Sequence, residues 1–158
     1  MTRDFNKWNE EAKVAELLTV DILSKLTDEY SFTWVGDIKE YRYKGDIIAT
    51  AADGKEIMIE VKNDSCIATT GNILCEEEVY VKDSDRYNKG NMYCDSDIFA
   101  VVSQEERLIY FFDFKRLKEI YKKGYYKVIP HLDEITYCYL LEYCRAKQWG
   151  AFITKIKY

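Results

Sequence analysis

The stretch 44–63 constrains the fold of this chain more than any other, because it has the pattern of a β-hairpin. Residues 46–50 are rich in β-branched side chains, and the dipeptide Asp53-Gly54 favours a tight hairpin turn. Residues 56–62 then form the expected return strand. The sequence therefore predicts two antiparallel strands joined at this turn.

Three charged residues gather at one end of this predicted hairpin. Because side chains alternate between the two faces of a strand, Met58, Glu60 and Lys62 share one side of the return strand. Asp46 heads the partner strand, opposite the end that carries Glu60 and Lys62. Charged groups that converge on an apolar hairpin are costly unless they are paired or used, so the pattern indicates a functional site. The alternative is that Glu60 and Lys62 form an ion pair on an exposed edge strand.

Asp46 followed, across a hairpin, by Glu60-Val61-Lys62 resembles the core motif of the PD-(D/E)xK nuclease superfamily, which has the restriction-endonuclease-like fold. Within it, the motif is most similar to the junction-resolvase and phage-nuclease branch. Gly45 stands where that family often has Pro. The resemblance implies a single α/β domain over residues 1–158, in which an N-terminal helix precedes a central mixed β-sheet flanked by helices.

The resemblance also implies a chemistry, which is metal-dependent endonucleolytic hydrolysis of phosphodiester bonds in DNA. Asp46 and Glu60 would hold Mg²⁺, with Mn²⁺ as a substitute, because a hard cation prefers oxygen ligands. Such a metal polarises the scissile phosphate and lowers the pKa of a bound water, which becomes the nucleophile. Lys62 would orient that water and stabilise the charge that develops on the phosphate.

Residues 8–26 have the spacing of a first helix, with Val14, Leu17, Leu18 and Ile22 as the expected core stripe. Residues 31–35 are the expected first strand.

The first helix of the resembled family often adds an acidic residue to the metal site. Glu16 matches that pattern best, as a further catalytic and metal-binding acid, and Glu11 is second. The alternative is that Glu16 lies on the solvated face of the helix, since Glu is favoured in helices anywhere.

The segment 69–76 resembles a region of several phage nucleases, in which a Thr-Gly-Asn turn enters a strand that ends in Glu. The resemblance implies that Asn72 contacts a substrate phosphate and that Glu76 is an additional metal ligand. The alternative is a turn followed by an edge strand whose acidic run 76–78 is solvated.

The rest of the chain yields coarser expectations. Residues 82–92 are polar and predict a loop or short helix, whereas 97–102 and 107–114 predict buried strands. Residues 115–123 predict a basic helix, and a solvated face is the preferred interpretation of its cations over phosphate contact. In 136–158, aromatic residues alternate with basic ones. This segment fits base stacking, and equally a core or a dimer surface.

The net charge of −5 argues against a nucleic-acid binder, but the charge is unevenly distributed. Residues 1–106 carry 12 Lys and Arg against 23 Asp and Glu, and residues 107–158 carry 11 against 5. An acidic half joined to a basic half suits a nuclease that grips phosphates from one side. The five cysteines are scattered and suggest reduced thiols rather than a zinc site, and His131 is expected to be structural or solvated.

With 47% apolar residues, no apolar run of membrane-span length and no signal-peptide pattern at the start, the sequence predicts a soluble, cytoplasmic globular protein without membrane contact. DNA is the expected partner, and a homodimer is plausible because cutting two strands needs two sites. Two alternatives stay open. One is a non-catalytic binding module on the same fold, such as a phage or host-defence protein that grips a nucleic acid or a protein. The other is a nuclease acting on RNA or single strands.

Overall fold

The structure is a computed structural model and describes residues 5–81, 86–124, 127–129 and 136–158. Its elements, in chain order, are α1 (Phe5–Leu26), β1 (Tyr30–Trp34), the 3₁₀ helix η1 (Lys39–Tyr41), β2 (Ile47–Ala51), β3 (Glu56–Asn63), α2 (Cys66–Thr70), β4 (Asn72–Val81), β5 (Arg86–Lys89), the 3₁₀ helix η3 (Asn91–Tyr93), β6 (Ile98–Ser103), β7 (Leu108–Asp113), α3 (Phe114–Lys122), β8 (Lys127–Ile129), β9 (Thr136–Glu142), α4 (Tyr143–Gln148) and β10 (Phe152–Lys157). The predicted α/β class is confirmed.

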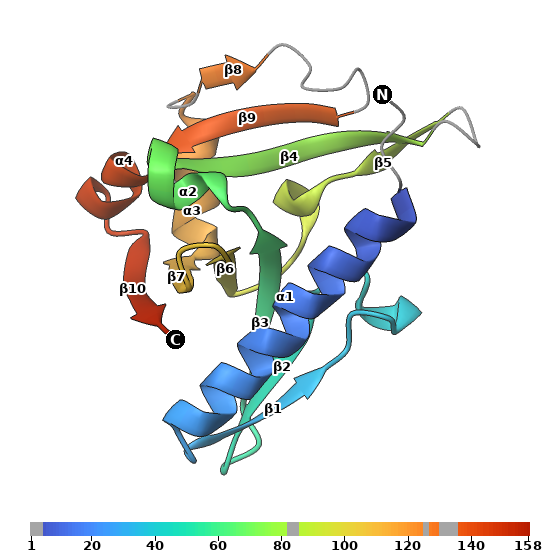
Figure 1. Cartoon of the computed structure of the whole chain (residues 1–158), viewed down its shortest axis with the longest axis vertical. Helices are drawn as coiled ribbons and strands as arrows, with labels where there is room; N and C mark the ends of the chain where they lie inside the picture. The colour runs from blue at the N-terminus through green and yellow to red at the C-terminus, as the bar shows by residue number, and fades with distance from the viewer. Residues whose placement is uncertain (1–4, 82–85, 125–126, 130–135) are drawn as a thin grey trace.

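The larger sheet has six strands in the order β1-β2-β3-β6-β7-β10. Only β3 and β6 run parallel, and the other neighbours are antiparallel. The predicted mixed sheet that follows an N-terminal helix is therefore present. Figure 1 shows α1 running diagonally in front of β2 and β3, with β10 near the carboxyl end of the chain.

The predicted hairpin is confirmed as β2 and β3. Ile47 lies opposite Ile59, and Thr50 lies opposite Glu56. The turn between the strands contains Gly54, whose φ of 83° lies in the left-handed region that glycine adopts without strain. The Asp-Gly dipeptide thus sets the register that later places Asp46 beside Glu60.

Each face of this sheet buries a separate apolar cluster. On one face α1 packs against β1, β2 and β3, and its buried residues Ala15 and Ile22 contact a cluster that includes Ile47 and Ile59. On the other face Phe99 and Phe112 pack with α3 and with buried residues of β4 and β9. The second cluster therefore fixes α3 and the second sheet on the face opposite to α1.

The expected core stripe of α1 is only partly right. Val14 and Leu17 are 54% and 44% exposed, whereas Ala15 and Thr19 are fully buried. Thr19 tolerates burial because its hydroxyl donates to the carbonyl of Ala15, 2.8 Å away. The buried stripe is thus rotated round the helix from the most apolar side chains, which the spacing of hydrophobic residues alone does not reveal.

A second, four-stranded sheet in the order β5-β4-β9-β8 was not foreseen. Figure 1 shows β4 and β9 side by side across the top of the molecule, in agreement with their antiparallel pairing. The alternative in which the turn is followed by an edge strand is wrong, because β4 lies between β5 and β9. The expected loop or helix at 82–92 contains β5 and η3, and its residues 82–85 lie outside the described part of the chain.

Between β3 and β4 the chain forms the short helix α2, for which no sequence pattern was identified. Asp64 precedes the N-cap residue Ser65, and its side chain accepts a hydrogen bond from the backbone N–H of Cys66 at 2.9 Å. Gly71 ends it with a φ of 67°. None of the described helices combines the length and apolar character needed to cross a bilayer. His131 lies outside the described residues.

Candidate functional site

Asp46 is fixed directly beside Glu60 by backbone hydrogen bonds. The N–H of Asp46 donates to the carbonyl of Ile59 at 2.9 Å. The N–H of Val61 donates in turn to the Oδ2 atom of Asp46 at 2.8 Å. Asp46 lies just beyond Ile47, the last paired residue of β2, and its two bonds hold it against the residues on either side of Glu60. The charge of Glu60 accordingly raises the pKa of Asp46. The two carboxylates that the sequence singled out are therefore neighbours.

Both carboxyl groups are removed from water and disfavour their charged forms. Burial, together with the neighbouring Glu60 and Glu16, raises the pKa of Asp46 to about 9. Burial also raises the pKa of Glu60 to about 7, although a hydrogen bond from Cys94 opposes the shift. Desolvation is the largest physical cause for both groups, and repulsion from neighbouring carboxylates adds to it. This pair is destabilised when fully ionised, unless a proton or a cation compensates it.

Lys62 follows Glu60 on the same face of β3 and pairs with Glu76. The Lys62 ammonium lies 2.5 Å from the Oε1 atom of Glu76, and the two side chains are 24% and 20% exposed. Because β3 and β4 belong to different sheets, this ion pair links the two sheets at the site. Glu76 is therefore not part of a solvated acidic run.

Glu16 reaches the carboxylate pair from α1. The indole Nε1 of Trp34 donates to the Oε2 atom of Glu16 at 2.6 Å. Burial raises the pKa of Glu16, and its charge is among those that raise the pKa of Asp46 and of Glu60. Glu16 also lines a hollow of about 300 Å³ beside Gly36. The helix acid ranked second, Glu11, lies on the exposed surface and pairs with Lys7 at 3.9 Å.

Asn72 stands at the start of β4, four residues before Glu76. Its side-chain amide donates to the carbonyl of Thr70 at 3.3 Å, and its backbone N–H bonds the Thr70 hydroxyl at 3.2 Å. These bonds stabilise the turn that contains Gly71. The structure therefore assigns Asn72 a local structural contact, and its expected phosphate contact stays a prediction.

The segment 90–97 supports the site, and no pattern in the sequence predicted this role. The Sγ atom of Cys94 donates to the Oε2 atom of Glu60 at 3.1 Å, and the thiol is almost fully buried. Ser96 lies 3.0 Å from that thiol and donates to the carbonyl of Lys44 at 2.6 Å, two residues before Asp46. The side chain of Asn91 accepts a hydrogen bond from the N–H of Glu76 at 2.9 Å. This short segment thus contacts β3, β4 and the residues that precede β2. The only available signal was its position directly before β6, the parallel neighbour of β3.

Lys118 on the basic helix α3 contacts other parts of the protein, although the sequence favoured a solvated face for this helix's cations. Its ammonium donates to the backbone carbonyl of Cys94 and lies 4.2 Å from the centroid of the Phe114 ring. Burial lowers the pKa of Lys118, while the charge of Glu60 acts in the opposite direction. This cation therefore belongs to the electrostatic environment of the carboxylate pair, which helical spacing alone did not show.

Within the described ranges, three or more His, Cys, Asp or Glu side chains do not form a group that could by itself hold a metal ion. The centre is instead a pair of carboxylates, Asp46 and Glu60, with Glu16, Lys62 and Cys94 around it. The chain matches no protein-family model, no curated protein and no solved structure.

Proposed function

We propose that this protein is a metal-dependent endonuclease that hydrolyses phosphodiester bonds in DNA, and that it belongs to the PD-(D/E)xK superfamily. The observation that carries the proposal is the burial of Asp46 beside Glu60, with Lys62 next on the same face. Two neighbouring buried carboxylates whose pKa values are both raised are unfavourable for stability alone. Perturbed carboxylates of this kind cluster at functional sites.

The donor set fits Mg²⁺. Asp46 and Glu60 offer hard carboxylate oxygens, and Mg²⁺ is commonly held by one or two carboxylates while it keeps several waters. A bound Mg²⁺ or Mn²⁺ supplies Lewis acidity toward a phosphate and an acidified water. Glu16 is a further acid, and its charge raises the pKa of both members of the pair.

The other side chains prepare the site. Cys94 donates to one oxygen of Glu60, which restricts the orientation of that carboxylate. Glu76 holds the Lys62 ammonium 2.5 Å away and so fixes the cation beside the pair. In the proposed reaction Lys62 orients the attacking water and stabilises negative charge that builds on the phosphate. Glu76 is thus a positioning residue, in addition to its expected place among the metal-binding acids.

The proposal is tested by cleavage of circular, linear, branched and single-stranded DNA, with RNA alongside. Each substrate is incubated with Mg²⁺, Mn²⁺ or EDTA. Lys62→Ala is expected to slow cleavage by about 10²- to 10³-fold, since it removes one contact to the developing charge. Lys55→Ala is the matched control, because Lys55 is an exposed lysine of the β2–β3 turn. Circular DNA also separates nicking from cleavage of both strands, which bears on the expected homodimer.

Metal-dependent cleavage that collapses in Lys62→Ala and persists in Lys55→Ala supports the nuclease. A folded wild-type protein that cleaves none of these substrates and binds no Mn²⁺ in calorimetry contradicts it. That second result favours a non-catalytic binding module. Preferential cleavage of RNA or of single strands would leave the chemistry in place and change the substrate.

A further inference from the structure

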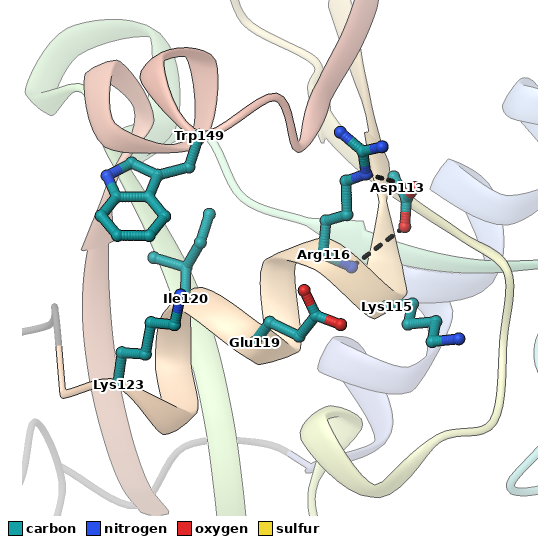
Figure 2. A pocket seen from close by; sticks show the side chains of 7 residues that line it. All are labelled: Asp113, Lys115, Arg116, Glu119, Ile120, Lys123 and Trp149. Atoms are coloured by element: carbon teal, nitrogen blue, oxygen red, sulfur yellow. Dashed lines mark hydrogen bonds and ion pairs between the residues drawn. The ribbon is translucent and has the colours of Figure 1, made fainter.

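A second hollow of about 390 Å³ lies between α3 and the end of α4. Figure 2 shows its lining, in which Trp149 stands above Ile120 and the charged side chains of α3 surround them. This volume is within the range of pockets that hold small ligands, about 300–1,000 Å³. It lies outside the carboxylate centre and contains none of the residues of that centre.

Trp149 offers the hollow a flat aromatic surface. Its side chain is 39% exposed at the C-terminal cap of α4. The ammonium of Lys123 lies 4.4 Å from the centroid of the indole ring. Lys123 thus lies over the indole ring, and a base would stack on the part of the indole that stays exposed, with its phosphate close to Lys123.

The charges of the lining favour an anion. Arg116 is paired with Asp113 at 3.5 Å and also donates to the carbonyl of Gly150 at 3.3 Å, as the dashed lines of Figure 2 indicate for the pair with Asp113. Asp113 is therefore compensated by Arg116. The remaining lining charges are Lys115 and Lys123 against Glu119, which leaves an excess of positive charge.

The helix α3 connects this hollow with the carboxylate centre. Lys118 contacts the carbonyl of Cys94, whose thiol bonds Glu60. Lys115 precedes Lys118 by three residues, so it is a neighbour of Lys118 on the helix surface. Lys118, near Glu60, and Lys115, which lines the hollow, are therefore neighbouring cations on the surface of α3.

We propose that the hollow binds an unpaired nucleotide of a nucleic-acid strand. Its base stacks on Trp149, and the adjoining phosphates lie against Lys115 and Lys123. This inference rests on the proposed function and deepens it, because it specifies a substrate that has a single-stranded segment beside the cleaved bond. Stacking accepts every base, so the site recognises single-stranded structure rather than sequence.

The binding test uses the full chain in EDTA, so that cleavage plays no part. Short fluorescein-labelled oligodeoxythymidine and oligouridine are titrated by anisotropy against the wild type, Trp149→Ala, Trp149→Phe and Lys123→Ala. Loss of one base-stacking contact is expected to weaken binding about 5- to 100-fold in Trp149→Ala. Trp149→Phe keeps an aromatic face and is expected to retain most of the affinity. Lys123→Ala is expected to lower the salt dependence by about one unit of slope.

The matched controls are Tyr158→Ala and Lys55→Ala. Tyr158 also carries a cation over its ring, with the Arg107 guanidinium 5.7 Å from the centroid, but it lies on the C-terminal side of β10 away from the hollow. Thermal melts establish that each variant is folded. Whether oligodeoxythymidine or oligouridine binds with the higher affinity shows whether the strand is DNA or RNA.

Affinity that falls in Trp149→Ala, recovers in Trp149→Phe and is unchanged in both controls supports the proposal. Unchanged affinity in Trp149→Ala, or an equal loss in Tyr158→Ala, overturns it. If Trp149→Ala binds the oligonucleotides normally while Lys62-dependent cleavage is observed, the proposed nucleotide site in the hollow is contradicted and the proposed nuclease function is kept. If oligonucleotide binding depends on Trp149 and no substrate is cleaved, the proposed nuclease function is contradicted and the proposed nucleotide site is kept.

Discussion

The thiol of Cys94 donates a hydrogen bond to the Oε2 atom of Glu60 across 3.1 Å, and both side chains are largely shielded from water. The bond connects the segment before β6 with the middle of β3. It favours the ionised form of Glu60 against the burial that raises its pKa. The protonation of a candidate metal ligand is thus set in part by a cysteine that the sequence motif does not contain.

The first prediction removes that donor. In Cys94→Ala the pKa of Glu60 is expected to rise further, by about 0.7 pH unit if the bond is worth about 1 kcal/mol. In Cys94→Ser, which restores a hydrogen-bond donor, the pKa of Glu60 is expected to lie between its values in the wild type and in Cys94→Ala. Carboxyl-carbon NMR of the metal-free protein follows the titration directly. Cys66→Ala is the control, because that thiol is exposed. An unchanged pKa of Glu60 in Cys94→Ala contradicts the prediction.

The second prediction changes the pKa of Glu60 in the opposite direction. The charge of Glu76 raises the pKa of Glu60, so Glu76→Gln is expected to lower it. The same variant weakens the ion pair with Lys62 and is expected to cost about 1–2 kcal/mol in the free energy of unfolding. The NMR titration and urea denaturation measure these two effects. Glu77→Gln, the neighbouring acid on β4, should show neither effect, and an equal loss in both variants would argue against a specific role of Glu76.

The third prediction concerns the stability of the metal-free protein at different pH values. The pKa values of Asp46 and Glu60, about 9 and about 7 in the folded protein, lie above those of the unfolded chain. The folded protein therefore keeps protons that the unfolded chain has released. Its free energy of unfolding should fall as the pH rises from about 5 toward 9, by up to about 1.4 kcal/mol per pH unit for each retained proton.

Thermal melts in EDTA across this pH window check the slope. Asp46→Asn is expected to flatten it, whereas Asp28→Asn, at an exposed position between α1 and β1, should not. If Mg²⁺ binds the pair, adding it should stabilise the protein most at the alkaline end. A wild-type stability that rises steadily between about pH 5 and pH 9 would falsify the assignment of raised pKa values to this pair.

The fourth prediction separates stability from activity at two glycines. A Cβ atom on Gly90 would meet the backbone carbonyl of Glu76, which cannot move without shifting β4. Gly90→Ala should therefore lower the free energy of unfolding by about 1–3 kcal/mol. A Cβ on Gly36 would meet the carboxylate of Glu16 and the indole of Trp34.

Side-chain ends move more easily than backbone, so Gly36→Ala should cost less stability but displace Glu16. Urea denaturation and the cleavage assay, run on both variants, make the comparison. Equal destabilisation by the two substitutions would contradict the distinction, and wild-type cleavage by a folded Gly36→Ala would remove Glu16 from the proposed mechanism.

The local part of the site was predictable from the sequence. The Asp-Gly turn fixes the register of the hairpin, and the period of two along β3 places Glu60 and Lys62 on one face. The α/β class was implied by the resemblance that Asp46, Glu60 and Lys62 carry. These features depend on residues near one another in the chain, where pattern and geometry are directly connected.

The remaining features depend on contacts between distant segments. Asn72 pairs with Glu142 across the second sheet, and no local pattern in β4 specifies that partner. The contact of Cys94 with Glu60 requires β6 to lie parallel to β3, so that the residues preceding β6 reach the site. Lys118 was assigned to solvent because helical spacing shows which residues share a side, but not what lies opposite them. Tertiary packing decided each of these cases.

The pairing of β4 with β9 also sets an order of events during synthesis. Glu76 lies on β4, whose partner on one side consists of residues 136–142. Contacts of such long sequence separation form late, because a long loop must close before they contribute. Lys62 and its neighbours therefore emerge from the ribosome well before the sheet that supplies Glu76 is complete. A nascent chain that has not yet passed residue 142 holds the carboxylate pair without its finished surroundings, so the proposed cleavage activity is expected to appear only after that point of translation.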